Sequence, residues 1–162
     1  MTFKIEGILA EYLAEDLDSL LDSDDEESPF FKCESPIEQL MYIALKKLFR
    51  NFEDFRDEYI FNIDSQKKIG KSKFRTDISL SFGDAEKRVM HLYAIECDGH
   101  EFHEKTKEQV RRDRERERYL MKKGYKVIRF SGSEIVEDPN ECAREVWTII
   151  KNDFKMLNGL SR

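Results

Sequence analysis

The chain has 162 residues, of which 40% are hydrophobic and 38% are charged, and its formal net charge is −6. This length is typical of one domain that buries its own core, and no apolar run reaches the roughly eighteen residues of a membrane-spanning helix, so we expect no membrane partner. Cys33, Cys97 and Cys142 are far apart and form no CxxC pair, which argues against a structural zinc. The N-terminus lacks the basic and apolar regions of a secretory signal, so we expect a cytoplasmic protein.

The first part of the chain is strongly acidic. Residues 1–34 contain two basic and eleven acidic residues, a net charge of −9, whereas residues 35–162 have a net charge of +3. Leucines at helical spacing between residues 8 and 21, followed by an acidic run, predict an amphipathic helix and a linker. We therefore expect an acidic N-terminal helix and linker over 1–34 and one folded domain over 35–162. Three roles stay open for the acidic segment: a solvated helix on the domain, an arm that binds a protein partner, and a cover for the basic face of the domain.

The folded domain is expected to begin with a helix. Ser35, Pro36 and Glu38 have the residue types of an N-cap, a first helical position and the third position of a capping box. From residue 37 to residue 48, apolar side chains recur at the spacing of one buried helix face. The two signals together predict a helix that packs on the core.

Four later segments have the patterns of β-strands. Residues 59–63 and 89–95 are largely apolar, residues 74–82 alternate between two faces, and residues 127–130 form a short apolar run. A basic turn is expected at 66–73, between the first two strands. The first three strands therefore predict an antiparallel meander.

A long charged helix is expected between the third and fourth strands. It covers about residues 107–123 and ends at Gly124, a residue type typical of helix C-termini. Apolar residues from Val146 to Leu157 predict a final helix. A three-strand meander followed by a helical crossover predicts an α/β fold with a mixed sheet flanked by helices.

Three carboxylates lie on neighbouring predicted strands. Asp77 stands among apolar residues of the second strand, and Glu96 and Asp98 stand two apart where the third strand ends. Period two places the latter pair on one face, and hairpin pairing brings Asp77 opposite Glu96. Carboxylates this close repel one another unless a cation neutralises them, and such oxygen ligands select Mg²⁺ or Mn²⁺. A set of surface acids on an open face is the alternative.

Two histidines, His100 and His103, follow the third strand, where active-site loops of open sheets tend to lie. Together with these histidines, five short motifs make the sequence resemble the PD-(D/E)XK restriction-endonuclease-like nucleases. Within them, it resembles most the very-short-patch repair endonucleases and related small uncharacterised domains. The motifs are Ser-Pro-Ile-Glu at 35–38, Phe-Arg-Thr-Asp at 74–77, Tyr-Ala-Ile-Glu-Cys-Asp-Gly-His at 93–100, Arg-Asp-Arg-Glu-Arg at 112–116 and Val-Ile-Arg-Phe at 127–130. The resemblance covers about residues 35–136. It implies a restriction-endonuclease-like core and metal-assisted hydrolysis of phosphodiester bonds.

The resemblance implies the metal ligands. Asp77 would be the metal-binding aspartate, Glu96 the acidic residue of the (D/E)XK tripeptide, and Cys97 a ligand through its backbone carbonyl. Asp98 stands where many relatives have a lysine and where the repair enzymes have a histidine. This departure leaves open which group activates the water: the candidates are His103 and a second metal-bound water. Lys68 or Lys73 of the neighbouring turn is the candidate for the positive charge.

The resemblance also implies supporting residues. His103 matches the second histidine of the repair branch, Asp113 the acid that orients it, and Glu38 the glutamate of the first helix, so all three are candidate catalytic residues. Two simpler roles stay open: Glu38 as a helix cap only, and Asp113 as a surface ion-pair partner of Arg116.

Two basic segments suit a partner with a phosphate backbone. Residues 65–76 contain five basic residues and no acid, and residues 105–126 contain ten basic and four acidic residues. Such contacts give affinity without sequence information. The residues expected to bind nucleic acid are Lys67, Lys68, Lys71, Lys73, Arg75, Arg112 and Arg116. We expect the last two, one helical turn apart, to point toward the site; a solvated helix with internal ion pairs is the alternative.

The first functional hypothesis is a Mg²⁺- or Mn²⁺-dependent DNA endonuclease. A second hypothesis is a catalytically weak or inactive nuclease-fold subunit that binds nucleic acid in a repair, restriction or defence system. A third is a defence or toxin component that acts on RNA. An enzyme that cuts both strands of a DNA duplex usually needs two active sites. A homodimer is therefore one of the states to be tested.

Overall fold

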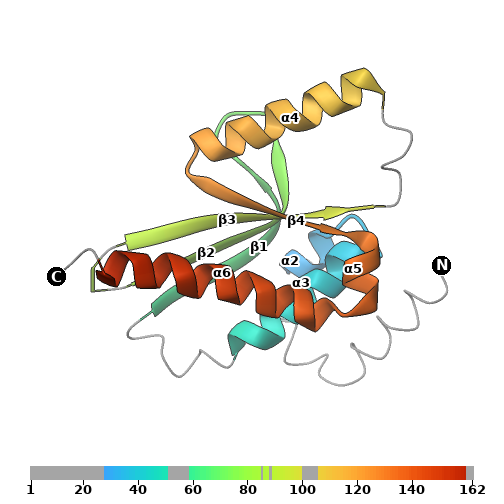
Figure 1. Cartoon of the computed structure of the whole chain (residues 1–162). Helices are drawn as coiled ribbons and strands as arrows, with labels where there is room; N and C mark the ends of the chain where they lie inside the picture. The colour runs from blue at the N-terminus through green and yellow to red at the C-terminus, as the bar shows by residue number, and fades with distance from the viewer. Residues whose placement is uncertain (1–27, 51–58, 85, 88, 100–105, 160–162) are drawn as a thin grey trace.

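The computed structural model describes residues 28–50, 59–84, 86–87, 89–99 and 106–159 (Figure 1). The helices and strands follow in the order α2 (Pro29–Lys32), α3 (Pro36–Arg50), β1 (Tyr59–Lys68), β2 (Arg75–Asp84), β3 (Val89–Asp98), α4 (Lys107–Lys122), β4 (Tyr125–Ser131), α5 (Gly132–Glu137) and α6 (Pro139–Gly159). The predicted acidic helix and His103 lie outside the described residues. Within these ranges, no helix combines the length and the apolar character needed to cross a membrane.

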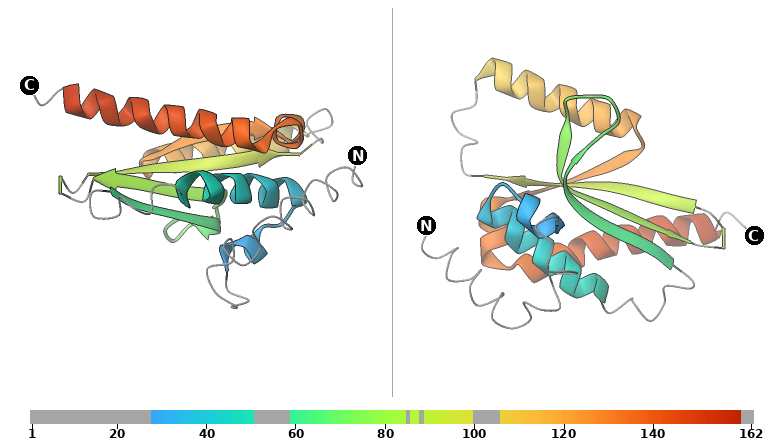
Figure 2. Two further views of the ribbon diagram at one scale, coloured as in Figure 1. Left: turned by 90° about the horizontal axis from the view of Figure 1, so that it is seen from below. Right: turned by 180° about the vertical axis from the view of Figure 1, so that it is seen from behind.

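The four strands form one mixed sheet in the order β1-β2-β3-β4. The first three are antiparallel neighbours, and α4 carries the chain across to β4, which is parallel to β3. In Figures 1 and 2, α4 lies on one face of the sheet, and α3 and α6 lie on the other. The predicted α/β fold, with a meander, a helical crossover and a mixed sheet, is confirmed.

Two apolar clusters hold these layers together. The larger cluster joins α3 and α6 to one face of the sheet and includes Ile78 and Ile95. The smaller cluster lies under α4 and includes Ala94 and Leu120. Ala94 of β3 belongs to the cluster under α4, whereas Ile95 belongs to the larger cluster. Since successive residues of a strand point to opposite faces, Glu96 also lies on the α4 face.

The predicted start of α3 is confirmed by its hydrogen bonds. The Glu38 amide donates to Ser35 Oγ at 3.4 Å, and the Ser35 hydroxyl donates to the Glu38 carboxylate at 2.8 Å. The Glu38 carboxylate also accepts the amide of Glu34 at 2.9 Å. These bonds satisfy backbone donors that a helix leaves free at its first turn.

The hairpin of β1 and β2 is longer than predicted. β1 continues to Lys68 instead of ending at Ile63, so the turn begins at Ile69 and not at residue 66. The end of the hairpin rises against α4, as the view from behind in Figure 2 shows. There Tyr119 Oη donates to the Ile69 carbonyl at 3.3 Å. This contact helps to hold residues 66–68 in the strand, although their polar and basic side chains do not show the alternation that predicts a strand.

Residues before position 35, where the folded domain was expected to begin, already pack on its core. Phe30 of α2 is part of the large core, and the Ser65 hydroxyl donates to the Pro29 carbonyl. The short helix α5 was also missed, because six residues are too few to show a helical period. A capping box of Ser131 and Glu134 starts it.

Candidate active site

The strand registers place four polar residues in one row across the sheet. Asp77 of β2 and Glu96 of β3 stand directly next to the last paired residues of these strands, Ile78 and Ile95, and Glu96 pairs with Arg129 of β4. On β1, the position opposite Asp77 is Gln66, where the ladder of paired residues is interrupted. The tertiary structure thus brings two acids, an amide and a guanidinium together from four strands.

Asp77 and Glu96 converge as predicted. Asp77 Oδ2 accepts the amide of Cys97 at 2.8 Å, which fixes this carboxylate against β3. Arg116 of α4 reaches both acids: its Nη1 lies 3.8 Å from Asp77 Oδ1, and its Nη2 forms an ion pair with Glu96 Oε2. The predicted orientation of Arg116 toward the site is confirmed.

The two carboxylates lie in a poorly solvated place. The side chain of Glu96 is 1% exposed and that of Asp77 is 20% exposed. Burial, with the negative charge of Asp77 as the second cause, raises the pKa of Glu96 to about 7. Burial also raises the pKa of Asp77. Among the described residues, neither carboxylate oxygen of Glu96 accepts a hydrogen bond of ordinary geometry.

Asp98 is bound to Arg129. Arg129 Nε donates to Asp98 Oδ2 at 2.8 Å, and Nη2 donates to Oδ1. This bidentate pair raises the pKa of Arg129. Both carboxylate oxygens of Asp98 are therefore used by the guanidinium, which is held next to Glu96.

The predicted convergence of three carboxylates on one cation is not seen. In the part of the chain that the structure describes, no three Asp, Glu, His or Cys side chains are grouped to hold a metal ion. The reason is that β4 and α4 bring Arg129 and Arg116 to the acids, so two guanidinium groups neutralise them. The pair Asp77 and Glu96 nevertheless fits a hard divalent cation, because both are oxygen donors and a buried oxygen of Glu96 lacks a hydrogen-bond partner there.

Glu38 lies at the edge of this row. It is 7% exposed, and besides capping α3 its Oε2 accepts Gln66 Nε2 at 2.9 Å. Its carboxylate is thus occupied by three donors from the chain itself. Glu38 therefore both caps the helix and connects α3 to the row.

An open cavity of about 520 Å³ lies beside the acids, between the end of the hairpin and α4. Its lining consists of Lys73, Phe74, Arg112, Asp113 and Arg116. Lys73 Nζ lies 5.5 Å from the centre of the Phe74 ring. The cavity combines three cations with one acid and one aromatic ring, which suits a phosphate-bearing ligand.

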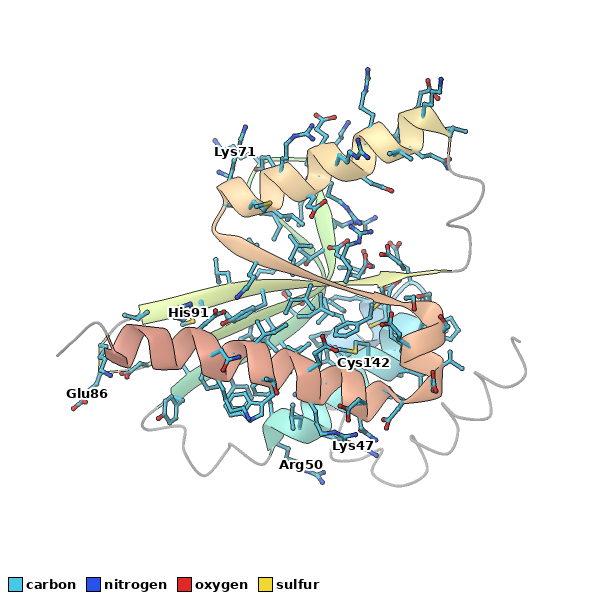
Figure 3. All side chains as sticks on the ribbon, viewed as in Figure 1. Lys47, Arg50, Lys71, Glu86, His91 and Cys142 are labelled. Carbon is cyan, nitrogen blue, oxygen red and sulfur yellow. The ribbon has the colours of Figure 1, made fainter. Side chains whose placement is uncertain are left out.

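The other predicted basic residues lie on or near the same hairpin. Lys68 and Lys71 are exposed, Lys67 is half-buried, and Arg75 forms an ion pair with Glu34 at 3.2 Å. In Figure 3, Lys71 lies next to α4, whereas Lys47 and Arg50 lie on the opposite side of the molecule. The surface around the hairpin is therefore basic, as expected.

The remaining candidates differ in how far the structure describes them. Asp113 lines the cavity, but the position of its expected partner His103 lies outside the described residues. Burial raises the pKa of the Cys97 thiol well above its ordinary value, so this thiol stays neutral and is no nucleophile. A metal-binding role of the Cys97 carbonyl stays a prediction.

Sequence reasoning missed Gln66 and Arg129. Arg129 could have been found from its place in a short strand that is parallel to β3, since strand order sets which residues become neighbours. Gln66 carried no signal, because it stands in a polar, basic stretch that resembles a turn.

The metal-free protein is expected to become less stable as the pH rises through the range 4.5 to 7. In the folded state Glu96 keeps its proton up to a pKa of about 7, whereas its ordinary value is 4.5. The folded protein therefore binds more protons than the unfolded chain over this range, and its free energy of unfolding falls by roughly 3 kcal/mol as the pH rises. Urea unfolding in EDTA at several pH values measures this slope. The slope should be clearly shallower in Glu96→Gln; equal slopes would contradict the assignment to Glu96.

A comparison with protein-family models matches residues 59–150 to REase_MTES_1575, a restriction-endonuclease-like family. Comparisons with curated proteins and with solved structures gave no significant match. The match covers the four strands, the crossover helix and the row of polar residues, and the mixed sheet flanked by helices is consistent with a restriction-endonuclease-like fold. Because the match spans more than half of the chain, the protein belongs to this restriction-endonuclease-like family, REase_MTES_1575.

Proposed function

We propose that the protein is a metal-dependent endonuclease that hydrolyses phosphodiester bonds in DNA. The observation that carries this proposal is the pair of buried Glu96 and partly buried Asp77, both of which Arg116 contacts from the lining of a cavity with three cations. Family membership supports a nuclease, and the metal, the substrate and the mechanism are our proposals.

Asp77 and Glu96 would hold Mg²⁺ or Mn²⁺, with the backbone carbonyl of Cys97 as a further ligand. When bound, such a cation polarises the scissile phosphate and lowers the pKa of a water molecule. The amide of Cys97 keeps the Asp77 carboxylate in place for this role. The raised pKa of Glu96 means that the two acids bind a cation best at neutral and alkaline pH.

The arginines would act on the phosphate. Arg129, which Asp98 holds beside Glu96, provides a fixed positive charge where the negative charge on the phosphate develops. A guanidinium held in this way can replace the electrostatic part of the missing lysine, but it cannot accept a proton. We propose His103, oriented by Asp113, as the base.

The cavity would bind the DNA backbone next to the cleaved bond. Lys73 and Arg112 lie on its two walls, one on the hairpin and one on α4. Their contacts position the strand without reading its sequence. The resemblance to the very-short-patch repair endonucleases suggests a role in DNA repair, which we propose as one setting for this activity.

One observation favours a second function. Asp98, at the position of the usual lysine, is bound to Arg129 and cannot serve as a free base. This supports a nuclease-fold subunit that binds nucleic acid with little or no cleavage, in a repair, restriction or defence system.

Incubation with supercoiled plasmid tests the proposal. We expect nicked or linear DNA with Mg²⁺ or Mn²⁺ and intact plasmid in EDTA. In a second assay, a labelled RNA should be cut more slowly than a labelled DNA of the same length. Manganese binding without cleavage, together with a shift of DNA in a gel, would favour the second function. Cleavage that continues unchanged in EDTA would contradict the metal dependence.

A further inference from the structure

Gln66 has an unusual backbone for a strand residue. Its φ is +49°, and among the residues that the structure describes it is the only one other than glycine with a positive φ. This left-handed region is unfavourable for a side chain with a Cβ and costs glycine nothing. A glutamine at this position therefore suggests that its side chain has a purpose.

The side chain of Gln66 is fixed from α3. Its Nε2 donates to Glu38 Oε2 at 2.9 Å, and the same carboxylate is held by the Ser35 hydroxyl and the Glu34 amide. Because the side-chain amide is planar, fixing Nε2 also fixes Oε1. Glu38 is buried, so water competes little for this hydrogen bond.

Gln66 is also placed next to the acids. It stands opposite Asp77 where the β1–β2 ladder is interrupted, in the row that continues to Glu96. No hydrogen bond from another described residue reaches its Oε1. Gln66 therefore carries an acceptor that no described residue uses, at the strand position next to Asp77.

We propose that Gln66 is a positioning residue of the metal-loaded site: its Oε1 accepts a hydrogen bond from a water of the cation held by Asp77. This rests on the proposed function. Mg²⁺ usually keeps several of its waters in proteins, and a bound water is a strong hydrogen-bond donor. The amide orients this water and takes no proton from it.

The variant Gln66→Gly separates the side chain from the backbone. Glycine relieves the left-handed strain but also removes the hydrogen bond to buried Glu38, so the two effects offset each other and the melting temperature should change little. The Mn²⁺ dissociation constant, measured by calorimetry, should increase about tenfold, because one hydrogen bond to the hydrated cation is lost. The kcat for plasmid cleavage should fall at least about tenfold with KM for DNA nearly unchanged.

Two further variants complete the experiment. Gln66→Asn tolerates the same backbone and keeps a shorter amide, so we expect kcat between the wild type and Gln66→Gly. Asn62→Gly, an exposed position of the same strand outside the row, should lower the melting temperature and leave Mn²⁺ binding unchanged.

The outcomes distinguish this inference from the proposed function. Unchanged Mn²⁺ affinity and kcat in Gln66→Gly would overturn it while leaving the nuclease intact. A wild type that binds Mn²⁺ without cleaving DNA would contradict the nuclease, and the calorimetric comparison would still decide on Gln66. A wild type that binds no Mn²⁺ overturns both.

Discussion

The variant Asp77→Asn is expected to lower metal-dependent DNA cleavage by about a thousandfold or more. An amide at this position removes one of the two charges that would hold the cation, and loss of a cation's charge stabilisation costs several kcal/mol of transition-state free energy. Binding to a DNA duplex in a gel should change less than threefold, because the basic residues of the hairpin and of α4 remain. Initial rates on supercoiled plasmid with 10 mM Mg²⁺, beside that binding measurement, check both statements.

A matched control exists on the same strand. Asp84 stands at the other end of β2 and forms an ion pair with Lys87 at 3.3 Å, away from the row. The same chemical change, Asp84→Asn, should leave cleavage within twofold of the wild type. If Asp77→Asn cleaves DNA as fast as this control, the site is elsewhere in the protein.

The variant Arg116→Ala is expected to destabilise the metal-free protein by about 3 kcal/mol at pH 8. Arg116 faces Glu96, which is 1% exposed, and removing one partner of a buried pair leaves the other charge uncompensated. The loss should shrink at pH 5, because Glu96 is then protonated in the folded state. Urea unfolding at the two pH values measures both effects.

Arg116→Ala should also bind Mn²⁺ more tightly than the wild type. The guanidinium contacts Glu96 Oε2 and approaches Asp77 Oδ1, the same oxygens that a cation would use. Removing this competitor should lower the Mn²⁺ dissociation constant, and added Mn²⁺ should restore most of the lost stability. Equal or weaker Mn²⁺ binding in the variant would show that Arg116 and the cation do not share the carboxylates.

Two comparisons identify the cause of these effects. Arg112→Ala removes an exposed arginine one turn earlier on α4, so its stability change should stay within about 0.5 kcal/mol. In the background of Glu96→Gln, Arg116→Ala should cost much less stability, since no buried charge remains to be compensated. An equal cost in both backgrounds would attribute the effect to packing of the arginine stem.

The position of Asp98 illustrates how a motif and a fold differ in what they specify. The motif places an acid two residues after Glu96 and thereby marks a departure from the usual lysine. The parallel pairing of β3 with β4 then supplies Arg129 to the same place. A positive charge beside the metal-binding acids is thus present, but it comes from a different strand.

Local sequence patterns predicted most of the fold. Alternation in β2 and the helical period of α3 have a short range and depend on one buried face, so the sequence alone predicts them. The extension of β1 to Lys68 escaped prediction because its support comes from α4, through Tyr119. The short helices α2 and α5 are too brief to show a period.

In the candidate site, too, some features follow from local sequence and others only from the tertiary structure. The sequence by itself predicted that Asp77 and Glu96 face each other, because hairpin pairing and period two follow from the chain's own pattern. It also determined the cap of α3 by Glu38. The sequence also predicted that Arg116 points toward the site, but only the tertiary structure decided that Arg116 contacts both acids, that Arg129 joins them and that Gln66 is held against Glu38. Those contacts join α3, α4 and four strands, and their geometry depends on strand order and helix packing, which no local spacing encodes.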